Sequence, residues 1–190
     1  AAHSPGIFTH IGLHTFADPR IEGCKINART TEDIVEVVEI SGREYLHYKP
    51  IPMDVAFIRG SYADEMGNVS VEHEGVSIDI LALAQAVHNN GGKVIVQVEG
   101  IVPAGSLDPW KVKIPGMLVD SLVLPDDPED QVQSRAGAFD GSLCGEGRKD
   151  DTDLVPVPLD AKKIIGRRAA MELKKDIVVN LGIGVAEYVS

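Results

Sequence analysis

Residues 77–98 read SIDILALAQAVHNNGGKVIVQV, and this stretch decides the fold class. Ser77 is a suitable N-cap, and apolar residues recur at helical spacing up to His88, which predicts a helix with one buried face: Ile80, Leu81, Ala84 and Val87. Asn89-Asn-Gly-Gly92 ends this helix, because these residues tolerate a left-handed backbone. Residues 93–98 then predict a strand, and a helix that leads into a hydrophobic strand is the unit of an α/β sheet.

The sequence before this unit predicts further strands. Residues 54–59 form a compact apolar run, typical of a strand buried on both faces. Residues 33–40 and 43–48 flank Ser41-Gly42, the spacing of a tight hairpin. Residues 63–66 and 69–72 flank Gly67-Asn68, which predicts a turn into a short strand. The first 29 residues indicate irregular structure around the short apolar segment Ile11–Phe16.

After the unit, residues 117–124 predict one more strand, and then the composition changes. Asp, Pro, Gly, Ser and Arg dominate residues 125–158, which indicates a linker or surface excursion that holds the domain boundary. Asp160 can cap a helix that runs through Leu173, with apolar residues every four positions. Residues 177–181 predict a buried strand that ends in the tight turn Gly182-Ile-Gly184.

Composition excludes some classes of function. The chain of 190 residues has a formal net charge of −11, which argues against a general nucleic-acid binder but allows an anionic small ligand. Cys24 and Cys144 are isolated, which fits a reducing cytoplasm better than a disulfide framework. The sequence shows no signal peptide and no apolar run of the roughly 20 residues that a membrane helix needs. We therefore expect a soluble cytoplasmic protein.

Three segments could carry chemistry. The Gly182 and Gly184 turn could offer backbone N–H groups to an anion or oxyanion, or could be purely structural. Arg59 could pair with a phosphate or with an internal carboxylate. Nearby Asp64 and Asn68 are explained by turn formation.

The third segment, residues 99–115, follows a strand end, where α/β proteins place ligands. Its Lys111 and Lys113 could meet phosphates or be ordinary surface residues. His10 and His14 lie four residues apart without a helical apolar face, so no metal site is predicted.

The order of several segments resembles family I coenzyme A-transferases, particularly the fused single-chain acetate or propionate enzymes. The resemblance covers nearly the whole chain and depends on this order, since no single motif would suffice. The segments are GLHTFADPR at 12–20, IRGSYADEMGN at 58–68, KVIVQV at 93–98, VKIPG at 112–116, IGRRAAMEL at 165–173 and VNLGIG at 179–184.

This resemblance implies a three-layer α/β/α fold of the coenzyme A-transferase and sugar-phosphate-isomerase type. Residues 1–124 would be the C-terminal part of a first domain, 125–158 a linker or surface excursion, and 159–190 the start of a second, similar domain. It also implies ping-pong transfer of coenzyme A between a short-chain acyl-CoA and a carboxylic acid. The nucleophilic glutamate is expected beyond Ser190, so these residues alone should be inactive. Glu187 lies too close to the glycine turn to fill that role.

The resemblance further implies that coenzyme A is a substrate, that no cofactor is bound permanently, and that the protein forms a homo-oligomer. The net charge and the lack of a long apolar run predict neither nucleic-acid nor membrane partners. Gly182, Gly184 and Val185 are expected to line the active-site cleft through backbone groups, and no residue present is assigned a catalytic role. Val185-Ala186 replaces the Ile-Pro frequent in the family, and no role is evident for His14. Two alternatives remain: an acyl-CoA hydrolase of the same family, or a non-catalytic α/β binding or dimerisation module.

Overall fold

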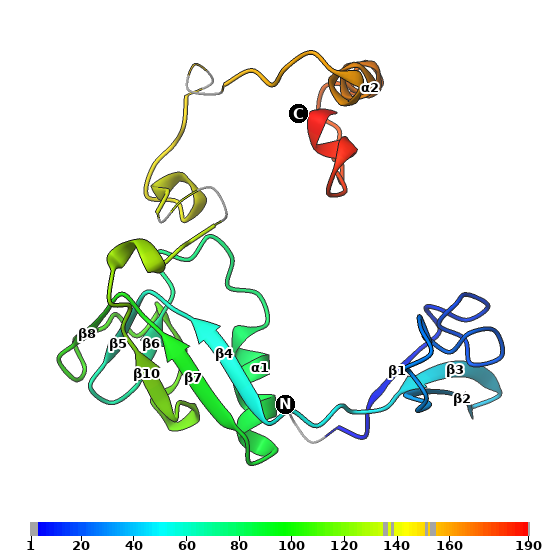
Figure 1. Ribbon diagram of the computed structural model, residues 1–190, viewed down its shortest axis with the longest axis horizontal. Coiled ribbons are helices and arrows are strands. Elements are labelled where there is room, and N and C mark those ends of the chain that lie inside the picture. The colour runs from blue at the N-terminus through cyan, green and yellow to red at the C-terminus, as the bar shows by residue number, and fades with distance from the viewer. Residues whose placement is uncertain (1–3, 135–136, 138, 151, 153–154, 190) are drawn as a thin grey trace. The chain divides into compact units, whose positions relative to one another are not determined.

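The computed structural model describes residues 4–134, 137, 139–150, 152 and 155–189 (Figure 1). The chain divides into two compact units, Ala1–Gly147 and Arg148–Ser190. Within the described residues, no helix is long and apolar enough to cross a membrane.

The centre of the first unit is a parallel three-stranded sheet with the order β10-β7-β4. Its strands are β4 (Val55–Arg59), β7 (Lys93–Gln97) and β10 (Ser121–Val123), and helix α1 (Ile80–Asn89) lies along one face (Figure 1). The buried side of the helix and the inward side chains of the strands form one apolar core, which includes Ala56, Ile58, Ala84, Val87, Val94 and Val96. The predicted helix-to-strand unit is therefore confirmed.

Strand β4 differs from its prediction in one respect. Ala56 and Ile58 are buried beneath α1, but Val55 and Phe57 on the opposite face are 45% and 78% exposed. The expectation that residues 54–59 are buried on both faces is wrong for the described structure. Alternate side chains of a strand point to opposite faces, and α1 covers only one of them.

Helix α1 begins later than the sequence predicts. Its N-cap is Asp79, which has a left-handed backbone (φ 62°) and makes no side-chain capping bond, so the prediction of Ser77 as N-cap is wrong. The C-terminal end is confirmed, because Asn90 donates its N–H to the last helical carbonyls and Gly91 adopts a φ of 76°.

A second sheet of four short strands has the order β8-β5-β6-β9. These are β5 (Tyr62–Asp64), β6 (Val69–Ser70), β8 (Gly100–Val102) and β9 (Val112–Ile114). Ala63 pairs with Val69, so the predicted turn at Gly67-Asn68 is confirmed. The sequence did not predict β8 and β9, because runs of three residues are too short to show an alternation. The 3₁₀ helix η1 (Gly116–Leu118) occupies the start of the strand predicted over 117–124.

The N-terminal residues form an antiparallel sheet with the order β1-β3-β2: β1 (Ile7–Thr9), β2 (Val35–Ile40) and β3 (Arg43–Tyr48). Ile40 pairs with Arg43, so the predicted hairpin is confirmed. Ser41 and Gly42 both have positive φ, at 53° and 76°, as a two-residue type I′ turn requires. The irregular segment after β1 packs Ala17 against Val35 and Leu46 of this sheet.

Between β10 and the end of the first unit, the described residues include the 3₁₀ helices η2 (Pro128–Asp130) and η3 (Gly141–Leu143). Asp127 caps η2, and Asp140 caps η3. Short capped turns of this kind are compatible with the absence of a sustained period in this part of the sequence.

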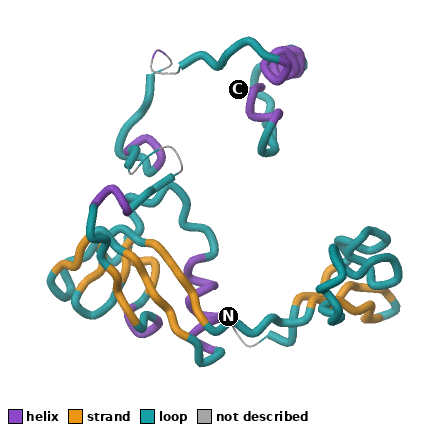
Figure 2. Tube along the Cα trace, in the orientation of Figure 1, coloured by secondary structure: helices purple, strands orange, loops and turns teal. Residues whose placement is uncertain are grey.

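The second unit contains α2 (Ala161–Ala170) and the 3₁₀ helix η5 (Val185–Val189). Asp160 accepts a hydrogen bond from the Lys163 N–H at 2.8 Å, so the predicted cap is confirmed, although the helix ends three residues before Leu173. Figure 2 shows loops and helices but no strand among the described residues of this unit. The strand predicted over 177–181 is therefore wrong, because no strand of the described residues pairs with this segment.

Candidate functional site

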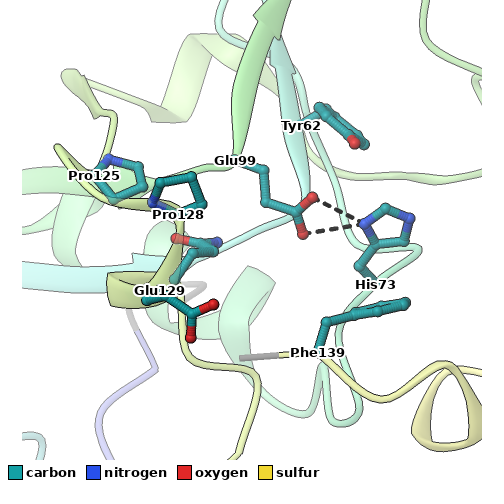
Figure 3. Close-up of a pocket in the computed structure, with 8 residues that line it drawn as sticks. Tyr62, His73, Glu99, Pro125, Pro128, Glu129 and Phe139 are labelled. Carbon is teal, nitrogen blue, oxygen red and sulfur yellow. Dashed lines mark hydrogen bonds and ion pairs between the residues drawn. The ribbon is translucent and has the colours of Figure 1, made fainter. Parts of the chain in front are cut away.

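A cavity of about 500 Å³ lies in the first unit at the carboxyl end of the parallel sheet. Tyr62 follows β4, Glu99 follows β7, and Pro125 follows β10, so three strand ends meet around it (Figure 3). The carboxyl edge of a parallel sheet is the usual ligand position in α/β proteins. The described residues that line the cavity are Tyr62, His73, Glu99, Pro125, Pro128, Glu129, Gln131 and Phe139.

His73 lies between two carboxylates on one wall of the cavity. Its Nδ1 is 3.0 Å from both carboxylate oxygens of Glu99, and its Nε2 is 3.4 Å from Oε1 of Glu146 (Figure 3 shows the Glu99 contacts). The imidazole also contacts the rings of Tyr62, at 5.5 Å between centroids, and Phe139, at 5.0 Å. The three rings form an aromatic wall, and the ring nitrogens of His73 in this wall contact the carboxylates of Glu99 and Glu146.

The backbone of His73 is held as well. Its N–H donates to Ser61 Oγ at 2.7 Å, and its carbonyl accepts from Gln133 Nε2 at 2.6 Å. Ser61 is fully buried and lies two residues after the end of β4. The ring position is therefore determined by the sheet edge and by the segment after β10.

Gln131 supplies an unused acceptor at this site. The residue is only 7% exposed, and its Nε2 donates to the Gly60 carbonyl at 3.0 Å. This bond fixes the orientation of the amide, and its Oε1 has no hydrogen-bond partner within the described part of the chain. Because a buried acceptor without a partner costs free energy, this oxygen is suited to a donor group of a ligand.

The electrostatic character of the cavity is acidic. None of its eight described lining residues is Lys or Arg, whereas Glu99 and Glu129 both line it. Burial raises the pKa of the Tyr62 hydroxyl, and the charges of Glu99, Glu72 and Glu146 raise it further. The site therefore favours cations and hydrogen-bond donors over anions.

Arg59 does not supply a free positive charge next to this cavity. Its guanidinium forms a bidentate ion pair with Glu74, with Nη2 2.7 Å from Oε2, and also donates to the Gln133 carbonyl at 2.9 Å. Of the two interpretations of Arg59, phosphate binding or pairing with an internal carboxylate, the structure shows the carboxylate.

Asp64 and Asn68 form the turn between β5 and β6. Asp64 is 2% exposed and accepts hydrogen bonds from the backbone of Met66, Asn68 and Gly105 and from the Asn68 side chain. The Asn68 side chain is the largest cause of the lowered pKa of Asp64, and the backbone N–H groups add to it. The predicted turn role is confirmed. Lys111 and Lys113 are exposed, and neither lines the cavity.

The glycine turn lies in the second unit. Gly184 has a φ of 105°, and its N–H donates to Oε1 of Glu187 at 3.1 Å. Gly182 and Gly184 have open space where a side chain would begin, and Val185 is 39% exposed at the start of η5. The turn thus offers accessible backbone in the second unit, whereas the cavity belongs to the first unit.

Most residues of the cavity were not predicted from the sequence. Residues 99–115 were expected to form a ligand loop because they follow a strand, and of the described lining residues Glu99 lies in that segment. His73 and Gln131 were missed, because 58 positions separate them and no local motif joins them. The signal in the sequence that could have found these residues is the set of polar side chains just after each parallel strand. Within the described residues, no group of three or more His, Cys, Asp or Glu could hold a metal ion.

Comparison with known proteins defines the class. The sequence profile described as "Coenzyme A transferase" matches residues 1–124, and the chain therefore belongs to the coenzyme A transferase family. This confirms the resemblance seen in the order of its segments, and the α/β architecture of the first unit agrees with it.

Individual relatives cover almost all of the chain. It is 47% identical over 190 residues to caffeate CoA-transferase of Acetobacterium woodii, and 45% identical over 188 residues to acetate CoA-transferase YdiF of Escherichia coli K12. It also matches the solved structure of the acyl-CoA transferase YdiF from Escherichia coli O157:H7 as a thioester complex with CoA, with a TM-score of 0.83 and 43% identity over 99% of this chain. The chain spans only about a third of each of these relatives, from 35% to 36% of their length.

Proposed function

We propose that the protein to which these residues belong transfers coenzyme A between a short-chain acyl-CoA and a carboxylic acid. The observation that carries the proposal is the match to the YdiF thioester complex with CoA, at 43% identity over nearly the whole chain. A covalent enzyme thioester divides the exchange into two steps, which is the usual advantage of nucleophilic catalysis. We assign the nucleophile to a glutamate that follows Ser190 in the polypeptide.

Within this chain, we assign Gly182, Gly184 and Val185 to the active-site cleft. Their backbone is exposed, and the absence of a side chain at the two glycines lets a thioester approach the N–H groups closely. Such N–H groups can stabilise the negative charge that develops on the carbonyl oxygen of the thioester. The Gly184 N–H now donates to Glu187, so substrate binding would require this carboxylate to move aside.

The remaining assignments follow from the same proposal. Coenzyme A acts as a substrate, no cofactor is held permanently, and acyl-CoA and a short-chain carboxylate are the partners. Neither nucleic acid nor a membrane takes part, and the protein assembles as a homo-oligomer in the cytoplasm. Cys24 and Cys144 are both free thiols, which supports a reducing compartment.

The test is an intact mass spectrum of the full-length protein before and after mixing with acetyl-CoA or propionyl-CoA. We expect a mass gain equal to bound CoA, removed by hydroxylamine and mapped to a glutamate beyond Ser190. Residues 1–190 alone should show no gain. If the full-length protein shows no gain with any of several acyl-CoAs, the transferase proposal fails in favour of a binding module. If the adduct forms but no carboxylic acid takes over its coenzyme A, and water instead cleaves the enzyme thioester to give back the glutamate and release free coenzyme A, the protein is a hydrolase.

A further inference from the structure

The cavity at the carboxyl end of β4, β7 and β10 has features that coenzyme A transfer does not explain. Acyl-CoA carries phosphates and the acceptor acid carries a carboxylate, so both substrates are anions. The described residues that line the cavity include no Lys or Arg that could bind these anions. They do include Glu99 and Glu129, whose carboxylates carry the same sign of charge as the substrates. A negatively charged site of this kind repels both substrates.

The same lining is suited to an organic cation. The ring centroid of His73 lies 5.5 Å from that of Tyr62 and 5.0 Å from that of Phe139. Pro125 and Pro128 form the opposite, apolar side of the cavity (Figure 3). Aromatic faces attract a cation, and carboxylates bind its N–H groups through charge-assisted hydrogen bonds.

A separate observation identifies where a donor would bind. Gln131 is more than nine-tenths buried and lines the cavity, and its Oε1 has no partner within the described residues. Its Nε2 is already committed to the Gly60 carbonyl, so the amide cannot turn to satisfy this oxygen by itself. Within the described part of the chain, the Oε2 carboxylate oxygen of Glu72 is also buried without a hydrogen-bond partner, and the charge of Glu72 acts on the nearby Tyr62.

We propose that this cavity is a binding site for a small organic cation, an ammonium or guanidinium group on an apolar or aromatic body. The cationic head would donate to Gln131 Oε1 and to the carboxylates of Glu99 and Glu129, and the body would pack between the aromatic wall and the prolines. The cavity of about 500 Å³ accommodates one ring with a short amine chain. A ligand here would be an effector or a second substrate group.

The test compares three probes of nearly equal shape by isothermal titration calorimetry on the full-length protein: 2-phenylethylammonium, 2-phenylethanol and 3-phenylpropionate. We expect the ammonium to bind with a dissociation constant below about 1 mM, the alcohol to bind about tenfold more weakly, and the acid not to bind. Added salt should weaken only the binding of the ammonium, because screening acts on its charge.

Variants locate the binding. Glu129→Gln removes one charge at an exposed position and should weaken the ammonium about tenfold, and Phe139→Ala should weaken both the ammonium and the alcohol. Glu39→Gln, an exposed residue at the end of β2, is the matched control and should change nothing.

Three outcomes would overturn the proposal. The first is that the acid binds as tightly as the ammonium, and the second is that the ammonium binds equally to Glu129→Gln and to the unaltered protein. The third is that the ammonium fails to bind while Glu129→Gln breaks up an oligomer, which would show that a cationic side chain of a second copy fills the cavity. No coenzyme A takes part in the titration, so its failure leaves the mass-spectrometric test of transfer unaffected.

Discussion

The guanidinium of Arg59 and the carboxylate of Glu74 form the most buried ion pair between Arg or Lys and Glu in the described residues, with Glu74 only 7% exposed in its side chain. Arg59 ends β4, and Glu74 lies in the segment that follows β6. The pair therefore ties the edge of the central sheet to the loop that carries His73.

Arg59→Met should destabilise the protein by about 3 kcal/mol, because it leaves the Glu74 carboxylate buried without its partner. The measurement is urea unfolding followed by circular dichroism. Arg168→Met is the matched control, since it removes the exposed helix pair with Glu172 and should change stability by less than about 0.5 kcal/mol. Equal losses in the two variants would show that burial of the first pair does not matter.

The N-terminal sheet should weaken as the pH rises. His47 donates from both ring nitrogens, through Nδ1 to Glu36 at 2.7 Å and through Nε2 to the Pro5 carbonyl at 2.8 Å, which requires a protonated ring. The Glu36 bond is the main cause that raises the pKa of His47 above its ordinary 6.5.

Because the folded pKa is the higher one, the stabilisation is complete below pH 6.5 and is lost as the pH rises through the folded value. Stability measured at closely spaced pH values from 5 to 9 should show this loss, and His47→Gln should abolish it. His10→Gln, an exposed residue in a turn, should leave the pH profile as it is. A profile that persists in His47→Gln would assign the effect to another group.

The hairpin turn can be improved. Ser41 has a φ of 53°, a conformation that asparagine tolerates better than serine, and Asn-Gly is the preferred pair for a type I′ turn. Ser41→Asn should raise stability by about 0.5 kcal/mol, whereas Ser41→Val should lower it by about 1–2 kcal/mol. Thermal unfolding distinguishes the two directions, and a stabilising valine would contradict the turn assignment.

The glycine turn can be tested against a matched glycine elsewhere. Gly184→Ala forces a side chain onto a φ of 105° and should reduce formation of the CoA adduct about 10-fold to 100-fold, through loss of backbone positioning. Gly91→Ala makes the same kind of change at a φ of 76°, also in open space, at the end of α1. The two should have similar stability, and an equal loss of adduct in Gly91→Ala would remove the special role of Gly184.

Local chemistry explains which parts of the fold the sequence predicted. The hairpin around Ser41-Gly42, the helix followed by β7, and the Asp160 cap each depend on residues that are close in the chain. The strand predicted over residues 177–181 was wrong because an apolar run becomes a strand only when a neighbouring strand pairs with it. The prediction of Ser77 as N-cap was wrong because Asp79 adopts a left-handed backbone, which moves the start of α1 to Ile80.

The cavity was harder to predict for a different reason. His73, Glu99 and Gln131 come from three separate segments, and only the parallel register of β4, β7 and β10 brings these segments to one edge. Gln131 lies within residues 125–158, which the sequence indicated as a linker or surface excursion. The composition of a loop is dominated by its solvent-exposed residues. It therefore does not identify a side chain, such as that of Gln131, that is buried.

The segment between β8 and β9 also affects how the protein can be observed in solution. It carries Trp110, the single tryptophan of the chain, whose residue surface is 95% exposed. Tryptophan fluorescence excited at the red edge of the absorption band will have nearly the same emission maximum in the folded and the unfolded chain. Quenching by iodide or acrylamide will be strong in both. This fluorophore is therefore a poor reporter of folding and a sensitive reporter of anything that covers the loop.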